Sequence, residues 1–89
     1  MAWRIEFDAV AVEALRRLDK TVQRRILDYL KKRIAPAENP RLWGKPLRGN
    51  KRGLWRYRVG DYRLLCQLRD DQLVVLVVDV GHRGHVYER

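Results

Sequence analysis

The sequence contains no serine, a single cysteine and no long apolar run. Without serine, a catalytic triad with a serine nucleophile is excluded. Because Cys66 has no second cysteine to pair with, an internal disulfide is excluded, which fits a reducing compartment. The longest apolar run, LVVLVV at 73–78, has the length of a strand and is far shorter than the roughly 20 residues of a membrane helix. We therefore expect a soluble, cytoplasmic protein with no membrane segment.

The residue spacings of common metal and nucleotide sites are also missing. No carboxylate pair and no Cys/His spacing forms a recognisable ligand set, so we expect neither a metal nor another cofactor. The stretch GNKRG at 49–53 has two glycines but lacks the pattern of a phosphate-binding P-loop. Chemistry that needs only a base, an acid and cations remains open.

Positive charge is plentiful and is concentrated in the middle of the chain. The net charge is +9, and residues 41–69 alone hold nine lysines and arginines against one acid, Asp61. Such a concentration favours a polyanionic partner, either nucleic acid or an acidic protein. The alternative is a basic surface that serves only solubility.

The hydrophobic pattern predicts one α+β domain over residues 1–89. AWRIEF at 2–7 alternates as a half-buried strand does, and two amphipathic helices follow, capped by Asp8 and Asp19. Pro36 ends the second helix, and a proline-rich loop extends to residue 46. The predicted order is β-α-α-β-β-β, with an antiparallel-rich sheet and both helices packed on one face.

The three later strands are predicted at 54–59, 62–69 and 73–80, joined by two-residue turns at 60–61 and 70–71. The last of them, which contains LVVLVVDV, has too little alternation for a half-exposed strand, so we expect it near the centre of the sheet. The place of the first strand in the sheet stays open.

Three arginines share one face of the predicted hairpin. With a turn at 60–61, Arg58 faces Arg63, and Arg56 lies on the same side with no acid between them. Opposed like charges destabilise a strand pair by roughly 0.2–1 kcal/mol, but the same guanidinium groups bind a phosphate well. We therefore predict an anion site there, the alternative being arginines that simply extend into water. Cys66 falls on the opposite, apolar side, which favours a structural thiol.

The C-terminal stretch GHRGHVYER supplies candidate proton carriers, namely His82, His85 and Tyr87. Strict alternation places His82 on the arginine side and Arg83 on the other, whereas a bulge or turn at a neighbouring glycine would exchange them. Cations with a base and an acid are sufficient for metal-independent RNA cleavage by the 2′-hydroxyl. The alternatives are exposed terminal histidines and a tyrosine that closes the core.

Three stretches of the chain resemble the RelE/ParE superfamily of toxins from type II toxin–antitoxin pairs: WRIEFDAVAVEALRRLDKTVQRRI, KPLRGNKRGLWRYRVGDYRLLCQL and VVLVVDVGHRGHVYER. The most specific part is LRG…WRYRVGDYRL followed by VGHR…VY, and together the stretches span nearly the whole chain. They are most similar to the RelE branch, whose members act as mRNA endonucleases in the ribosomal A site through the 2′-hydroxyl of the mRNA.

The resemblance implies roles for individual residues. The phosphate and its developing charge would be held by Arg56, Arg58, Arg63 and Arg83, the last of which the family favours pointing inward. Tyr87 would be the base, while His82 and His85 resemble the acid and base histidines of other branches, so the proton carrier stays open. Contacts to RNA or ribosome are assigned to Lys45, Arg48, Lys51 and Arg52.

The resemblance also implies partners: an acidic, RelB-like antitoxin, the ribosome with its mRNA, and operator DNA reached through the antitoxin complex. Two alternatives from other functional classes remain. One is a ParE-like toxin that inhibits gyrase, and the other is a non-catalytic basic module that binds nucleic acid.

Overall fold

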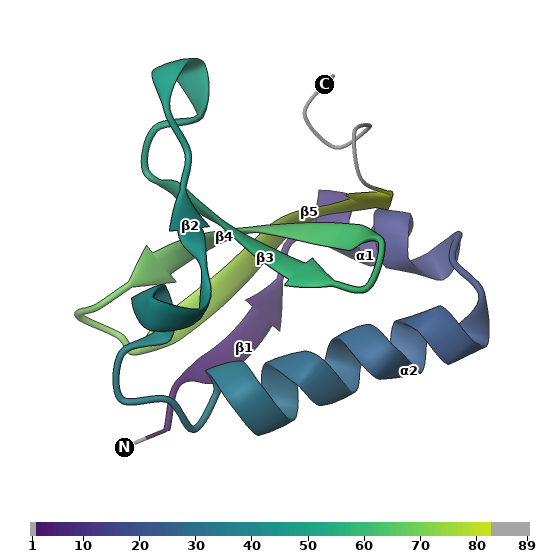
Figure 1. Ribbon diagram of the computed structural model, residues 1–89, viewed down its shortest axis with the longest axis horizontal. Helices are drawn as coiled ribbons and strands as arrows, with labels where there is room; N and C mark the ends of the chain where they lie inside the picture. The colour runs from purple at the N-terminus through teal and green to yellow at the C-terminus, as the bar shows by residue number, and fades with distance from the viewer. Residues whose placement is uncertain (1, 83–89) are drawn as a thin grey trace.

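The computed structural model describes residues 2–82. The sheet has five strands in the order β1-β5-β4-β3-β2, in which β1 runs parallel to β5 and the other neighbours are antiparallel (Figure 1). The elements are β1 (Arg4–Phe7), α1 (Ala9–Arg16), α2 (Lys20–Tyr29), β2 (Lys45–Pro46), β3 (Leu54–Val59), β4 (Tyr62–Arg69) and β5 (Val74–His82).

The two helices begin where the sequence predicts, but only one has a side-chain cap. The Asp8 carboxylate accepts a hydrogen bond from the Ala11 amide at 2.9 Å. Asp19 occupies the equivalent position before α2, but its side chain makes no capping hydrogen bond. A π-helical turn, Leu30–Ile34, extends α2 and ends just before Pro36. None of the helices within residues 2–82 is long and apolar enough to span a bilayer.

Both helices pack on one face of the sheet, which confirms the predicted α+β arrangement. Ala11 of α1 is fully buried, as are Ile26 of α2 and Ile34 of the π-helical turn. The sheet side of this core is formed by Tyr57, Val59, Leu64, Cys66, Val75, Val77 and Val80. The apolar strand β5 lies between β1 and β4, as its lack of alternation predicted.

The hairpin between β3 and β4 has the predicted register. Val59 pairs with Tyr62 across the turn, and Arg58 pairs with Arg63. Gly60 has φ 58°, a conformation that glycine adopts without the steric penalty of a side chain.

The other connections differ from the prediction. Four residues, 70–73, join β4 to β5 in place of a two-residue turn, because Arg69 pairs with Val74 and Leu73 has φ 52°. The predicted loop before residue 46 contains a 3₁₀ turn, Pro40–Trp43, and the short strand β2. The first strand begins at Arg4, two residues later than predicted, and lies at one end of the sheet.

A β-bulge in β5 changes which side chains face the helices. Cys66 of β4 pairs with Val77, but Leu65 pairs with Asp79, so Val78 is an extra residue on β5. Before the bulge, Val77 faces the helices. After it, Val80 and then His82 do so. The alternation along β5 is therefore shifted by one residue.

Candidate functional site

Three arginines occupy the side of the β3–β4 hairpin that faces away from the helices, and we call this surface the arginine face. Arg58 lies directly opposite Arg63, and Arg56 lies opposite Leu65 on the same side. Lys45 of β2 pairs with Arg56 from the other direction and adds a fourth cation. These side chains face outward because their neighbours on β3 and β4, such as Tyr57 and Leu64, fill the core.

Exposure differs among the arginines in a way that matters for binding. Arg58 is exposed, while Arg56 and Arg63 are half-buried. A half-buried guanidinium is screened less by solvent and salt, so it attracts an anion more strongly than an exposed one. The arginine face therefore combines two half-buried guanidinium groups, those of Arg56 and Arg63, with the exposed side chain of Arg58, which extends into solvent.

Asp79 is an acid on this face that the sequence analysis missed. It pairs with Leu65, which places its side chain on the outward side, diagonal to Arg63. Its side chain is largely buried, and its carboxylate accepts a hydrogen bond from the Val80 amide at 2.8 Å. The expectation that no acid lies among the arginines is therefore wrong. The signal was an aspartate inside an otherwise apolar strand, and the bulge hid the side to which it points.

The basic residues predicted to contact RNA lie around the segment between β2 and β3, which projects away from the sheet (Figure 1). Arg48 and Arg52 are exposed, and Lys51 is half-buried. The Leu47 amide donates to the Leu54 carbonyl at 3.0 Å, so the segment leaves the sheet at the start of β3. Among the three arginines of the face, Arg56 lies nearest to it along the strand.

His82 does not lie on the arginine face, contrary to the expectation from strict alternation. It pairs with Tyr62, and the two rings meet edge to face with centroids 5.3 Å apart. The physical reason is the β-bulge. Because Val78 is an extra residue on β5, each later residue of the strand faces the side of the sheet opposite to the one that strict alternation predicts. The other predicted residues of the C-terminal stretch, Arg83, His85 and Tyr87, lie outside the described residues.

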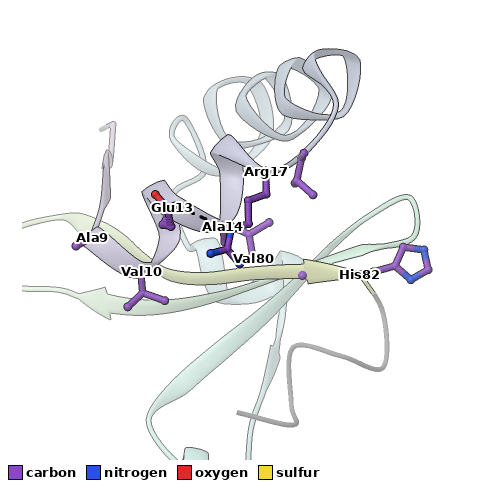
Figure 2. Close-up of a pocket in the computed structure, with 9 residues that line it drawn as sticks. Ala9, Val10, Glu13, Ala14, Arg17, Val80 and His82 are labelled. Carbon is purple, nitrogen blue, oxygen red and sulfur yellow. Dashed lines mark ion pairs between the residues drawn. The ribbon is translucent and has the colours of Figure 1, made fainter.

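His82 instead borders a groove of about 500 Å³ between α1 and the end of β5 (Figure 2). On the helix side the groove is lined by Glu13 and Arg17, whose charged groups lie 3.9 Å apart. Figure 2 shows the imidazole of His82 pointing outward from the strand end. The groove and the arginine face are therefore on opposite sides of the sheet.

Two buried ionisable groups belong to the core and do not reach the arginine face. Burial raises the pKa of the Cys66 thiol, so the thiol stays protonated and is a poor nucleophile. Burial also raises the pKa of Tyr57, whose hydroxyl donates to the Pro40 carbonyl at 2.9 Å. Within residues 2–82, no group of three or more histidine, cysteine or acidic side chains is placed to hold a metal ion.

Comparisons with known proteins place the chain among toxins of type II toxin–antitoxin pairs. The family model described as "ParE toxin of type II toxin-antitoxin system, parDE" matches residues 5–87. Toxin RelG of Mycobacterium tuberculosis is 28% identical over 100% of both chains. The mRNA interferase toxin RelE of Escherichia coli is 35% identical, over 93% of this chain and 85% of RelE.

Solved structures of RelE proteins have the same fold. The toxin chain in the RelBE2 toxin–antitoxin complex of M. tuberculosis superposes with a TM-score of 0.85 at 26% identity, covering 93% of this chain and 100% of that one. A double mutant of E. coli RelE in complex with a RelB peptide gives a TM-score of 0.72 at 31% identity, covering 94% of this chain and 86% of that one. The chain therefore belongs to the RelE/ParE superfamily of type II toxins, and within it to the RelE-like branch.

Proposed function

We propose that this toxin is an mRNA endonuclease that cleaves messages in the A site of the ribosome without a metal ion. The observation that carries the proposal is the pairing of Arg58 with Arg63 on an open face, next to half-buried Arg56. Two guanidinium groups held in such a register attract an anion that can accept hydrogen bonds from both of them. The names of relatives such as the E. coli mRNA interferase toxin RelE support RNA as that anion.

In the proposed reaction the 2′-hydroxyl of the mRNA attacks the adjacent phosphorus, and the bond from phosphorus to the 5′-oxygen breaks. A base takes the proton of the 2′-hydroxyl, an acid protonates the departing 5′-oxygen, and negative charge builds up on the phosphoryl oxygens. We assign the stabilisation of that charge to Arg56, Arg58 and Arg63, together with Arg83. Arginine stays protonated near neutral pH, so these residues act through charge and hydrogen bonds.

We assign the base to Tyr87, because a phenolate is favoured beside several guanidinium groups. His82 and His85 are the alternative proton carriers. For His82 the position opposite Tyr62, on the helix side of the sheet, weakens that assignment. The basic side chains of Lys45, Arg48, Lys51 and Arg52 would contact the RNA or ribosome beside the reacting phosphate.

The partners follow from the same proposal. An acidic antitoxin would neutralise the toxin by covering basic surface, as the solved complexes of RelE relatives with RelB suggest for this chain. The toxin would then reach operator DNA only through the antitoxin. Free toxin would act in the cytoplasm on translating ribosomes.

Primer extension on a short mRNA in a purified translation system tests the proposal. The wild type should cut within the A-site codon only when ribosomes are present, and both Arg63→Ala and Tyr87→Phe should reduce cutting by at least about a hundredfold, as expected for losing charge stabilisation or a base. Arg69→Ala is the matched control. Arg69 is on the same face of the same strand, six residues or about 20 Å from Arg63, so its loss should leave cutting unchanged.

An intact message with folded, antitoxin-free wild-type toxin would overturn the proposal. The second candidate is inhibition of gyrase, which the description of the matching family as a ParE toxin favours. Gyrase-dependent breaks in the DNA of cells that express the toxin would support it, and the arginine face would then serve as a docking surface.

A further inference from the structure

Two adjacent apolar residues, Leu42 and Trp43, are exposed on the 3₁₀ turn that lies between the end of α2 and β2 (Figure 1). Leu42 is 81% exposed and Trp43 is 48% exposed. Within residues 2–82, Trp43 is the one aromatic side chain that is exposed. Leaving a large aromatic ring in water forgoes the free energy of burying it. Neighbouring apolar side chains of this size on the surface are typical of a binding site.

The turn that carries these two residues is held firmly. The carbonyl of Pro40 accepts a hydrogen bond from the buried Tyr57 hydroxyl, and the Arg41 guanidinium donates two hydrogen bonds to the Asp70 carboxylate. The two residues that follow Arg41 are therefore presented in a fixed position. A surface that is already ordered loses little conformational entropy when a ligand binds to it.

One face of the Trp43 ring is covered by a cation. The guanidinium carbon of Arg33, in the π-helical turn, lies over the ring at 5.1 Å from its centroid. Arg33 is itself exposed, and within the described residues it takes part in no ion pair. The exposed part of Trp43 then belongs to the other face and the edges of the ring. A flat ring can stack on that face while Arg33 stays available to an anion.

A hollow of about 320 Å³ between α2 and the end of β3 also has Arg33 in its lining. The other lining residues are Arg25, Asp28, Tyr29, Lys32 and Val59. Lys32 lies 4.0 Å from Asp28 and is partly neutralised, whereas Arg25 has no acid within ion-pairing distance in residues 2–82. Because Arg33 borders both the hollow and the ring, they form one basic surface. We call Arg25, Arg33, Leu42 and Trp43 the Trp43 surface.

The Trp43 surface adjoins the arginine face at one edge of the sheet. Lys45 pairs with Arg56 on the arginine face, and it belongs to β2, the terminal strand of the sheet. Trp43 precedes Lys45 by two residues, so their backbones are at most about 7 Å apart. A single strand of RNA that crosses the arginine face can therefore pass Lys45 and reach the Trp43 ring around this short edge.

We propose that the Trp43 surface binds an unpaired base of RNA. The base would stack on the open face of the indole and contact Leu42, and Arg25 and Arg33 would bind neighbouring phosphates. An aromatic ring beside a basic groove is the usual arrangement of single-strand binding sites. A second copy of the toxin fits poorly, because it brings the same cations and a net charge of +9. The inference rests on the proposed function in identifying the anion as RNA.

The probe is a ten-nucleotide single-stranded RNA made uncleavable by 2′-O-methyl groups, and its affinity is measured by fluorescence anisotropy at low salt. Trp43→Leu keeps an apolar side chain but removes the ring, so it should weaken binding at least about fivefold. Trp43→Phe keeps a ring that can stack and should retain most of the affinity. In the wild-type complex, NMR should show NOEs between the indole protons of Trp43 and protons of a base.

Two controls separate stacking from other effects of the substitution. An oligomer of the same length and backbone that lacks all its bases should bind wild type and Trp43→Leu equally, because only phosphate contacts remain. Leu27→Ala removes an apolar side chain that is 45% exposed, almost as much as Trp43, and lies outside the Trp43 surface. It should leave RNA binding unchanged. Circular dichroism confirms that each variant is folded.

Full affinity of Trp43→Leu for the RNA would overturn the inference and would point to an apolar protein as the occupant of this surface. An equal loss of affinity for the RNA and for the base-free oligomer would also overturn it, as would the absence of NOEs from Trp43 or of any RNA binding by the wild type. Cleavage on ribosomes is measured separately. Cleavage without stacking at Trp43 contradicts this inference alone, and stacking without cleavage contradicts the proposed endonuclease alone.

Discussion

Tyr57 connects the core to the turn before β2. Its side chain is fully buried between the sheet and α2, and its hydroxyl donates to the carbonyl of Pro40. A Cβ on Gly44 would lie 2.8 Å from the Tyr57 ring, so the absence of a side chain there lets the backbone pass closely over the aromatic. The register of Lys45 with Arg56 depends on this close approach, because Gly44 immediately precedes β2.

Removing the Tyr57 hydroxyl should therefore destabilise the protein. Tyr57→Phe leaves the buried Pro40 carbonyl without its donor, and we expect a loss of about 1–3 kcal/mol in the free energy of unfolding. Urea denaturation followed by circular dichroism measures this loss. Tyr29→Phe removes a hydroxyl that makes no hydrogen bond within residues 2–82, so it should cost less than about 0.5 kcal/mol. Equal losses in the two variants would contradict the role assigned to Tyr57.

Arg41 and Asp70 form a bidentate ion pair. Its Nη1–Oδ1 and Nη2–Oδ2 distances are 2.9 and 2.7 Å. Hydrogen bonds from the Arg41 guanidinium hold the pKa of the Asp70 carboxyl below its ordinary value. Since this pKa is lower in the folded than in the unfolded state, the pair stabilises the fold at neutral pH. That stabilisation is lost as the pH falls through the folded-state value.

Titration of the Asp70 carboxyl carbon by NMR tests the pair directly. The measured pKa should lie below the ordinary aspartate value of about 3.9, and Arg41→Gln should raise it toward that value. Arg69→Gln is the control, because Arg69 is next to Asp70 in the chain but hydrogen-bonds to Gln67. A titration that does not respond to Arg41→Gln would exclude the ion pair as the cause.

At the scale of secondary-structure elements, the sequence predicted those parts that local rules determine. A two-residue turn with glycine sets the register of a hairpin, so the pairing of Arg58 with Arg63 and the apolar side of β3 and β4 were predictable. The same applies to α1, whose start is marked by Asp8, and to the end of α2 before Pro36.

Other features were not predictable because nothing in the local pattern marks them. In LVVLVVDV nearly every residue is apolar, so the extra residue Val78 leaves no break in an alternation that is already absent. The sides to which Asp79 and His82 point were therefore hidden as well. Strand β2 is two residues long and ends in a proline, so only its pairing with β3 defines it.

The two helix starts offer a matched comparison of capping. Asp8→Ala removes the hydrogen bond to the Ala11 amide, and we expect the free energy of unfolding to fall by about 1 kcal/mol. Asp19→Ala removes a carboxylate that makes no such bond, so it should cost less than about 0.5 kcal/mol. Thermal and urea unfolding of both variants provide the measurement, and the reverse order of losses would show that the caps are wrongly assigned.

At the scale of the whole molecule, positive charge is present on both sides of the sheet. The arginine face and the segment between β2 and β3 form one basic region. The exposed side chains of Lys20, Arg24 and Lys31, on α2 and the π-helical turn that extends it, provide further positive charge on the helix layer. The two regions lie on opposite sides of the sheet, so each can attract an anionic partner separately. A net charge of +9 also makes each association sensitive to salt.

The salt dependence of RNA binding should report how many phosphates the projecting segment neutralises. With a single-stranded RNA made uncleavable by 2′-O-methyl groups, replacing Arg48 and Arg52 together by Gln should reduce the slope of log K against log salt by about 1.4, or about 0.7 for each phosphate that an arginine no longer neutralises. Fluorescence anisotropy at several salt concentrations measures the slope. The control pair is Arg16→Gln with Arg17→Gln, on the helix side, where both cations lie beside Glu13. A slope that changes equally in both pairs would show that only total charge matters.

The bulge at Val78 has a consequence for how the chain can vary in evolution. The extra residue at this position determines which side of the sheet each later residue of β5 faces. A single-residue deletion there would therefore exchange the two sides for Asp79, Val80 and His82 at once. Such a deletion would bring an acid into the core and turn a valine out to solvent, although the sequence would look almost unchanged. We therefore expect selection to act more strongly on the number of residues in this part of β5 than on which residue occupies position 78.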